Sequence, residues 1–215
     1  MPRAGLTPER VVDLALGVLD DDGWDGMTLA AVAGRAGVAV PSLYKHVRGL
    51  PDLRRRVALV CVREFDARLR AAAGRSSREP GDAVRAMAVT VRAYGIDHPG
   101  RYAAVQGGDW AHDPDAIELE AASAAAVGTI AESLAALDLP ADRTTDAIRA
   151  VRALVHGFVT LQQSGGFGMP DDVEMSFTRA VDALVAGLAA GEATRHRPGR
   201  AEGRPPGGDR PSGQP

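Results

Sequence analysis

The sequence predicts an all-α protein, and three observations lead to this prediction. Alanine, valine and leucine recur at helical spacing through most of the chain, whereas no segment alternates apolar and polar residues as a strand does. Aromatic residues make up only 4% of a chain that is 45% hydrophobic, so the core must be built mainly from small aliphatic side chains. Such side chains favour helices that pack closely. At 215 residues the chain can hold one medium domain, or a small domain joined to a larger one.

The first helix is expected to begin after Thr7, because threonine is a good N-cap and Pro8 suits the first turn. Glu9 places a negative charge near the positive end of the helix dipole. Apolar residues at positions 11, 14, 15, 18 and 19 then recur at helical spacing. Gly23 is expected to end this helix.

Two short helices are expected next. Thr28 is placed to cap the segment LAAVAGRA, which Gly37 terminates. A third helix covers about residues 40–47, with Pro41 tolerable only in its first turn. Two short helices joined by a glycine-containing turn after a longer helix form a helix-turn-helix. A packed helical hairpin that does not bind DNA has the same spacing, so spacing alone leaves both interpretations open.

Longer helices are expected in the rest of the chain, separated by glycine- and proline-rich breaks. They span about residues 51–73, 80–98, 113–137, 144–163 and 171–190, with a short helical turn at 101–105. Pro51 opens the first of them, Asp113 caps the third, and Asp171 forms a capping pair with Glu174 in the last. Residues 191–215 contain five prolines, six glycines and no large aliphatic residue, so this tail is predicted to be disordered.

Composition excludes several classes of protein. No apolar run reaches the roughly 18 residues needed to cross a bilayer, and the N-terminus lacks the apolar core of a secretory signal. Cys61 is the only cysteine, which fits a reducing compartment, so we expect a cytoplasmic protein. The net charge of −3 argues against a protein that coats nucleic acid. It leaves room for a local DNA-binding face, because only the contacting surface must be positive.

No cluster of residues suited to catalysis is found, so we expect no enzyme activity, no metal and no cofactor. The five histidines lack metal-ligand spacing. The stretch DWAHDPD could be a weak metal site, but its Asp-Pro-Asp order favours a helix cap. The glycine-rich SGGFG lacks the lysine of a phosphate loop and favours a helix C-cap. Cys61 lies on an apolar helical face and is predicted to be a buried, inert thiol.

The segment MTLAAVAGRAGVAVPSLYKHVRGLPDLRRRV resembles the N-terminal domain of the TetR/AcrR family of transcriptional regulators. The residues that match the family pattern are Thr28, Val32, Ala33, Ala36, Gly37, Val38, Ser42, Leu43, Tyr44, His46 and Leu53. The resemblance covers about 45 residues and implies a DNA-binding regulator. The later part of the chain, from HPGRY to HGFVTLQQSGGFG, resembles the WHG type of C-terminal ligand domain in the same family.

The resemblance implies which side chains face DNA. Carried over by position, they are Thr28, Ala39, Val40, Pro41, Ser42, Tyr44, Lys45 and His46, to which Arg48 is added as a phosphate contact. Leu50 stands where the family usually has a lysine, and Gly49 where it usually has a Ser or Asn cap. We expect Arg48, Arg54 and Arg55 to replace the lost phosphate contact. Residues 1–50 carry five basic and six acidic side chains, so charge adds no independent support.

The resemblance also implies a ligand cavity in the C-terminal helices. The candidate ligand-binding residues are Phe65, Met87, Tyr94, His98, Tyr102, Gln106, Trp110, His156, Phe158 and Gln162. For each of them, ordinary core packing is the alternative interpretation. The last two helices are candidates for a dimer interface, through Ala147, Val151, Val155, Ala180, Leu184, Gly187 and Leu188. Burial within one chain is the alternative for these side chains.

Together these patterns predict a three-helix DNA-binding domain at residues 1–50 and a larger helical effector-binding and dimerisation domain at residues 51–190. The expected function is that of a homodimeric repressor released from a palindromic operator by a small-molecule effector. The expected partners are double-stranded operator DNA, the effector and a second copy of the chain, with no membrane. The alternative is a small-molecule-binding helical protein whose DNA binding is weak or vestigial.

Overall fold

The structure is a computed structural model that describes residues 5–76, 79–107, 113–170 and 172–193. These residues form eight α-helices and three short 3-10 helices, without any strand in the described ranges. In chain order the elements are α1 (Pro8–Gly26), α2 (Leu29–Ala36), η1 (Val40–Lys45), α3 (Leu50–Arg75), α4 (Asp82–Asp97), α5 (Pro99–Val105), α6 (Ile117–Leu134), η2 (Ala135–Leu137), η3 (Ala141–Arg143), α7 (Thr144–Gln163) and α8 (Val173–Ala193). The all-α prediction is confirmed. No helix of the described ranges combines the length and the apolar character needed to cross a membrane.

The expected caps form at the starts of the first two helices. The Thr7 hydroxyl accepts a hydrogen bond from the backbone N–H of Arg10 at 3.2 Å, and the Thr28 hydroxyl accepts one from Ala31 at 3.1 Å. Each bond satisfies an amide that the helix itself leaves without a partner. Gly37 ends α2 in the left-handed conformation, with φ 68°. The local prediction of these boundaries is confirmed.

Three elements differ from expectation. Helix α1 continues to Gly26 past a kink at Gly23, whose φ is 75°, so Gly23 interrupts the helix rather than ending it. The third helix is a 3-10 helix, η1, rather than an α-helix. Helix α6 begins at Ile117 because the Asp113 carboxylate caps a turn instead, accepting from the N–H of Asp115 at 2.9 Å.

The cap of α8 is formed by Asp172, whose carboxylate accepts from the N–H of Glu174 at 2.8 Å. The expected cap residue Asp171, like the tail at 194–215, lies outside the described residues.

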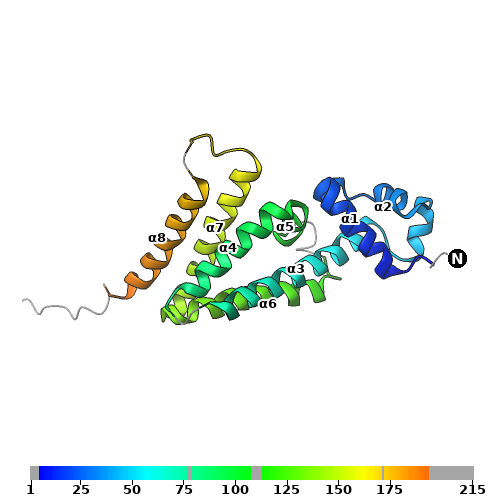
Figure 1. Cartoon of the computed structure of the whole chain (residues 1–215). Helices are drawn as coiled ribbons and strands as arrows, with labels where there is room; N and C mark the ends of the chain where they lie inside the picture. The colour runs from blue at the N-terminus through cyan, green and yellow to red at the C-terminus, as the bar shows by residue number, and fades with distance from the viewer. Residues whose placement is uncertain (1–4, 77–78, 108–112, 171, 194–215) are drawn as a thin grey trace, which may run out of the picture.

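Two large cores lie along the length of the molecule, with a smaller cluster between α3 and α6, and α3 takes part in all three. In Figure 1, α1 and α2 lie at one end, and α3 runs from them along α6 toward the other helices. Buried residues of α1, α2 and η1 form the N-terminal core together with Leu53, Val57 and Cys61 of α3 and Ala104 of α5. The other half of α3 contributes Phe65 and Leu69 to a core shared with α4, α7 and α8. The first turns of α3 and part of α5 therefore stabilise the helix-turn-helix from the other domain.

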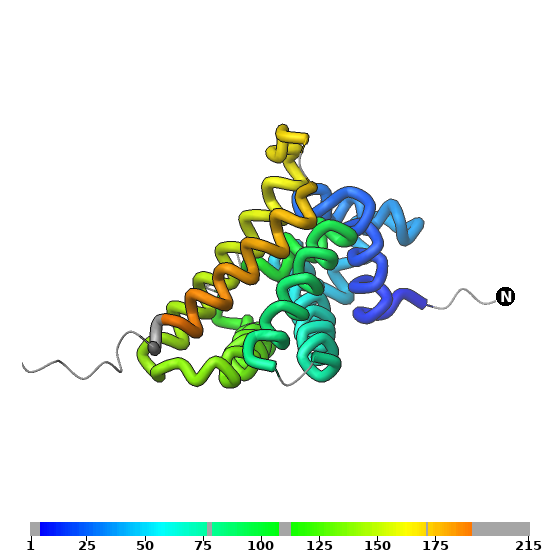
Figure 2. The backbone as a smooth tube through the Cα atoms, turned by 60° about the vertical axis from the view of Figure 1, so that its left-hand side comes forward, coloured from blue at the N-terminus to red at the C-terminus, as the bar shows by residue number. Residues whose placement is uncertain are grey.

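Helices α7 and α8 form an antiparallel pair along one side of the molecule, as Figure 2 shows. Val151, Val155 and Val159 of α7 are buried with Phe177 and Val181 of α8 in the C-terminal core. The opposite faces of both helices are exposed. Burial within one chain thus occupies one face of each helix and leaves the other available to solvent.

Candidate functional site

The turn between α2 and η1 sets the angle of the helix-turn-helix. The N–H of Gly37 donates to the carbonyl of Gly34, and the N–H of Val38 donates to the carbonyl of Ala33, both at 3.1 Å. These bonds close the C-terminus of α2 while the chain reverses. A side chain at position 37 would be strained at this positive φ. Below the turn, Leu43 of η1 is fully buried and fixes η1 against α1 and α2.

The outer face of η1 carries most of the residues expected to meet DNA. Tyr44 is 58% exposed, although tyrosine is a large side chain that is usually more covered. Lys45, Pro41 and Ala39 are exposed too. Val40, Ser42 and His46 are half-buried, and Thr28 is exposed at the start of α2. On a short element the arrangement offers the hydroxyls of Ser42 and Tyr44, the ammonium group of Lys45 and small apolar surfaces.

Arg48 lies directly after η1 and is tied to two acidic residues. Its backbone N–H donates to the Asp52 carboxylate at 2.9 Å, and its guanidinium lies 3.0 Å from the Asp115 carboxylate. The Arg48 side chain is 68% exposed. Because such an exposed ion pair is weak, the guanidinium can exchange Asp115 for another anion at small cost.

The expectation that Arg54 and Arg55 contact phosphates is wrong. The Arg55 side chain is only 12% exposed and is bonded to both Asp52 and Asp113. The guanidinium of Arg54 lies over the Trp24 ring, 5.2 Å from its centroid, and donates to the Trp24 carbonyl. Both arginines stabilise contacts within the protein. This role depends on tertiary packing and not on the local sequence.

Asp52 is the centre of an ion network at the start of α3. Only 5% of its side chain is exposed, and it contacts Arg48, Arg55 and Arg56. Burial alone raises the pKa of Asp52, but hydrogen bonds from Arg48 and Arg56 and the charges of Arg56 and Arg55 outweigh burial and lower it. Through Arg55 the network reaches Asp113, which precedes α6. The exit of the helix-turn-helix is thus tied to the C-terminal domain.

Helix α5 makes a second connection, to α1 and α3. The Arg101 guanidinium donates to both carboxylate oxygens of Asp20 on α1 and to Glu64 on α3, each at 2.7 Å. Gly100 packs so closely on α1 that an added Cβ would overlap the carbonyl oxygen of Leu19. The ion pairs also occupy part of the acidic end of α1, where Asp21 is paired with Arg35 at 2.6 Å.

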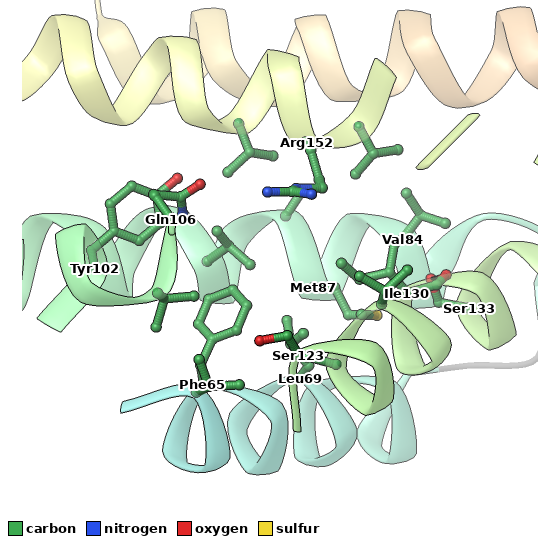
Figure 3. A pocket seen from close by; sticks show the side chains of 18 of the residues that line it. Phe65, Leu69, Val84, Met87, Tyr102, Gln106, Ser123, Ile130, Ser133 and Arg152 are labelled. Carbon is green, nitrogen blue, oxygen red and sulfur yellow. Dashed lines mark hydrogen bonds between the residues drawn. The ribbon is translucent and has the colours of Figure 1, made fainter. Parts of the chain in front are cut away.

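A cavity of about 190 Å³ lies between α3, α4, α5, α6 and α7 (Figure 3). Four of the ten expected ligand residues line it: Phe65, Met87, Tyr102 and Gln106. Most other lining side chains are aliphatic, among them Val62, Leu69, Val84, Ile130 and Val151. The cavity therefore has the mostly apolar wall and the few polar groups that small-molecule sites show.

The other expected ligand residues lie elsewhere. His156 does not line the cavity, but its Nδ1 lies 3.2 Å from the Tyr102 hydroxyl. Tyr94 is buried between Phe65 and His98, at ring distances of 5.6 and 5.4 Å. Phe158 packs against Phe167 and Phe177, and Gln162 accepts a hydrogen bond from Arg92 at 2.8 Å. Tyr94 and Phe158 follow the alternative interpretation of core packing, whereas His156 is exposed. Trp110 lies outside the described residues.

Sequence reasoning missed three polar residues of the cavity wall, Ser123 and Ser133 on α6 and Arg152 on α7. Ser123, Ala126, Ile130 and Ser133 line one face of α6 at helical spacing. In a segment where nearly every residue is small or apolar, that face could not be told from the others. For Arg152 a signal existed, because it stands one helical turn before His156.

The side chains expected at the dimer interface are mostly inside the chain. Ala147, Val151 and Val155 are at most 9% exposed and belong to the C-terminal core. Leu184 and Leu188 pack against the same core, whereas Gly187 is exposed. The expectation that Val151 and Val155 form the interface is wrong, because they already pack against helices of their own chain.

No group of His, Cys, Asp or Glu side chains in the described ranges is arranged to hold a metal ion. His112 of the DWAHDPD stretch falls outside those ranges. Cys61 is fully buried, and burial raises the pKa of its thiol to about 12, in agreement with the predicted inert thiol.

Comparison with known proteins covers both halves of the chain. A family model described as the tetracyclin repressor-like C-terminal domain matches residues 84–184. The chain is 37% identical over 192 residues to Rv0681 of Mycobacterium tuberculosis, an uncharacterized HTH-type transcriptional regulator, across 86% of this chain and 83% of the relative. It is 30% identical over 188 residues to YobS of Bacillus subtilis, another uncharacterized HTH-type transcriptional regulator, across 87% and 95% of the two chains. A protein of unknown function from Rhodococcus sp. RHA1 has a similar solved structure, with a TM-score of 0.71, 26% identity, and coverage of 88% of this chain and 99% of that one.

Proposed function

The chain belongs to the TetR family of DNA-binding transcriptional regulators, and from this we propose that it is a homodimeric repressor released from a palindromic operator by a small-molecule effector. Residues 1–50 would bind DNA, and residues 51–190 would bind the effector and the second subunit. One observation carries this proposal. Helix α5 and its C-cap residue contribute Tyr102 and Gln106 to the cavity wall, and the start of the helix contributes Gly100 and Arg101 to the contact with α1.

A helix of only seven residues thus joins the cavity to the helix-turn-helix. If an effector moves Tyr102 or Gln106, α5 cannot move alone, because Gly100 and Arg101 fix it to α1. Helix α1 in turn packs on α2. An effector that prefers the displaced position of α5 therefore changes the position of η1 and weakens operator binding by linkage.

The side chains of η1 suit two kinds of DNA contact, those with the phosphate backbone and those with the bases. Tyr44 and Lys45 are exposed and can donate to phosphate oxygens, which fixes the register of the protein on DNA. Val40, Pro41 and Ser42 offer small surfaces that suit thymine methyl groups and groove shape. Thr28 and Arg48 flank this surface. Ala39 and His46 complete it at the two ends of η1.

The exposed faces of α7 and α8 support a dimer through the last two helices, by different side chains from those first expected. Ala153 and Leu161 on α7, and Met175 and Ala186 on α8, are exposed; the two larger ones, Leu161 and Met175, are 46% and 49% exposed. Small side chains let helices of two subunits approach closely. A two-fold dimer would place two copies of η1 in successive major grooves, about 34–36 Å apart.

The proposal is tested by selecting binding sites from random double-stranded DNA with the native protein. The recovered sites should be palindromic. Fluorescence anisotropy on such a site should then show weaker binding for Tyr44→Phe and for Lys45→Ala, with a salt dependence reduced by about one ion per subunit for the lysine variant. The control is Arg63→Ala, which removes the same charge from an exposed side chain on α3, paired there with Glu118.

Two results would count against the proposal. Recovery of no palindrome would favour the alternative, a small-molecule-binding protein with vestigial DNA binding. If Lys45→Ala bound as well as Arg63→Ala at every salt concentration, η1 would not be the docking element.

A further inference from the structure

We propose that the cavity binds a small monocarboxylate, with its apolar tail inside the cavity and its carboxylate at the mouth against Arg152. This inference names the chemical class of the effector, and it rests on the proposed function only in taking the cavity as the effector site. It follows from the size of the cavity, the nature of its wall, and the position of Arg152.

The size of the cavity limits the tail. An apolar cavity of about 150 Å³ in another protein holds one benzene molecule, and the volume here is about 190 Å³. The larger cavities that hold drug-sized ligands start at about 300 Å³. A single ring or a chain of roughly eight carbons therefore fits this cavity in its present form.

The apolar inner wall of the cavity disfavours any charged group on the ligand tail. Phe65, Leu69, Val84, Met87 and Val155 are all buried and present only apolar surface to the cavity, except for the weakly polar sulfur of Met87. None of the lining residues that the structure describes is acidic, so nothing in this wall would compensate a cationic group. A positively charged ligand is therefore disfavoured on both desolvation and Coulomb grounds.

Arg152 is the only charged residue among the described residues of the cavity wall. Figure 3 shows its side chain reaching from α7 to the cavity, with Gln106 and Tyr102 of α5 beside it. Within the described ranges its guanidinium has no hydrogen bond or ion pair, whereas most other arginines of the helical body are paired. Arginine binds a carboxylate through two parallel hydrogen bonds.

The position of Arg152 also keeps the cost of binding low. The side chain is exposed, so a carboxylate bound there stays in contact with water and does not lose its full hydration. Gln106 can add a hydrogen bond from its amide group. The carboxylate then lies between α7 and α5, which is the helix that contacts α1.

Ser123 inside the cavity weakly favours ligands whose tail carries an oxygen atom. Its hydroxyl is buried and has no hydrogen-bond partner among the described residues. A buried hydroxyl left without a hydrogen-bond partner is unfavourable. A tail that carries an oxygen at the level of Ser123 would offset part of this unfavourable contribution, whereas a purely hydrocarbon tail would not.

The test uses three linear probes of eight carbons each: octanoate, 1-octanol and octylammonium. Binding to the native protein without DNA is measured by isothermal titration calorimetry. Octanoate should bind at least about tenfold more tightly than 1-octanol, as expected when a charge-assisted pair replaces a neutral contact. Octylammonium should bind more weakly than either.

Two variants of α7 provide the matched comparison. Arg152→Met should weaken octanoate binding about tenfold and leave 1-octanol unchanged. Arg149→Met removes an exposed arginine one turn away that does not line the cavity, and should leave both affinities unchanged. Ala126→Phe, which fills the cavity from α6, should abolish binding of both probes if its melting temperature shows that it folds.

Three outcomes would overturn the proposal: no binding of octanoate, equal affinity of native protein for octanoate and 1-octanol, or equal loss in Arg149→Met and Arg152→Met. None of them bears on operator selection, so failure of the ligand class can be distinguished from failure of the repressor function. Conversely, octanoate binding that depends on Arg152 supports the ligand class even if the protein selects no palindrome.

Discussion

Replacing Arg101 with methionine should remove the hydrogen bonds that join α1 to α3 and so lower the free energy of unfolding. The guanidinium joins Asp20 of α1 to Glu64 of α3 through three hydrogen bonds of 2.7 Å. Only 22% of the Arg101 side chain is exposed, and its stem packs at the junction. Methionine keeps much of the apolar stem. The variant therefore loses the charged hydrogen bonds while most packing remains.

The magnitude follows from the exposure of the partners. A hydrogen bond to a charged group contributes about 1.5–3 kcal/mol when well shielded. The side chains of Asp20 and Glu64 are 34% and 26% exposed, so solvent screening reduces this figure. We expect a loss of about 2 kcal/mol in the free energy of unfolding at pH 7. For a chain of this length, that loss lowers the melting temperature by about 4–8 °C.

The loss should also depend on pH. The hydrogen bond from Arg101 lowers the pKa of Asp20, and hydrogen bonds from Arg68 and Arg101 outweigh burial to lower the pKa of Glu64. Groups with lowered folded-state pKa values stabilise the protein above their unfolded values, near 4, and lose this contribution as the pH falls through the folded values. The difference in free energy of unfolding between the native protein and the variant should therefore be constant from about pH 7 to pH 5 and decrease below about pH 4.

Urea unfolding of both proteins at these pH values measures this difference in free energy of unfolding. Arg63→Met serves as the control, because its pair with Glu118 is 61% and 75% exposed and should contribute less than about 1 kcal/mol. If Arg101→Met matched the native protein at pH 7, or if the difference increased on acidification, the assignment of Arg101 as the connection between α1 and α3 would be refuted.

Three further predictions concern packing, the thiol and assembly. Gly100→Ala should destabilise the protein by about 1–3 kcal/mol in urea unfolding, because the new Cβ overlaps the Leu19 carbonyl; unchanged stability would mean that α5 can move away from α1 freely. Cys61 should react with a thiol reagent at pH 8 only as fast as the protein unfolds, because its thiol is buried with a pKa of about 12, and a rapid reaction of native protein would contradict the burial. Ala186→Glu should give monomers by light scattering if α8 forms the dimer interface, whereas the control Val89→Glu, at an exposed apolar residue of α4, should not. A dimer that survives the change at Ala186 would place the interface elsewhere.

Local chemistry made several features of this protein predictable from sequence alone. The caps at Thr7 and Thr28 and the left-handed Gly37 depend on hydrogen bonds and dihedral angles within four residues, so neighbouring letters suffice to predict them. The inward face of the helix-turn-helix was also predictable, because Val32 is larger than the alanines and glycine around it and Leu43 is an apolar residue between Ser42 and Tyr44. The family pattern follows from the same positions.

Tertiary structure alone decided which faces of the C-terminal helices meet one another. Their surfaces are rich in alanine and valine on several sides, so periodicity cannot say whether Val155 faces a partner subunit or its own core. The same weakness hid Ser123 in the cavity wall. Arg55 was expected beside DNA from its place in the sequence. In the structure it instead donates a hydrogen bond to Asp113, which lies far from it along the chain. The physical reason is common to all three: a side chain's partner is set by how helices distant in sequence pack, and small, similar side chains permit more than one packing.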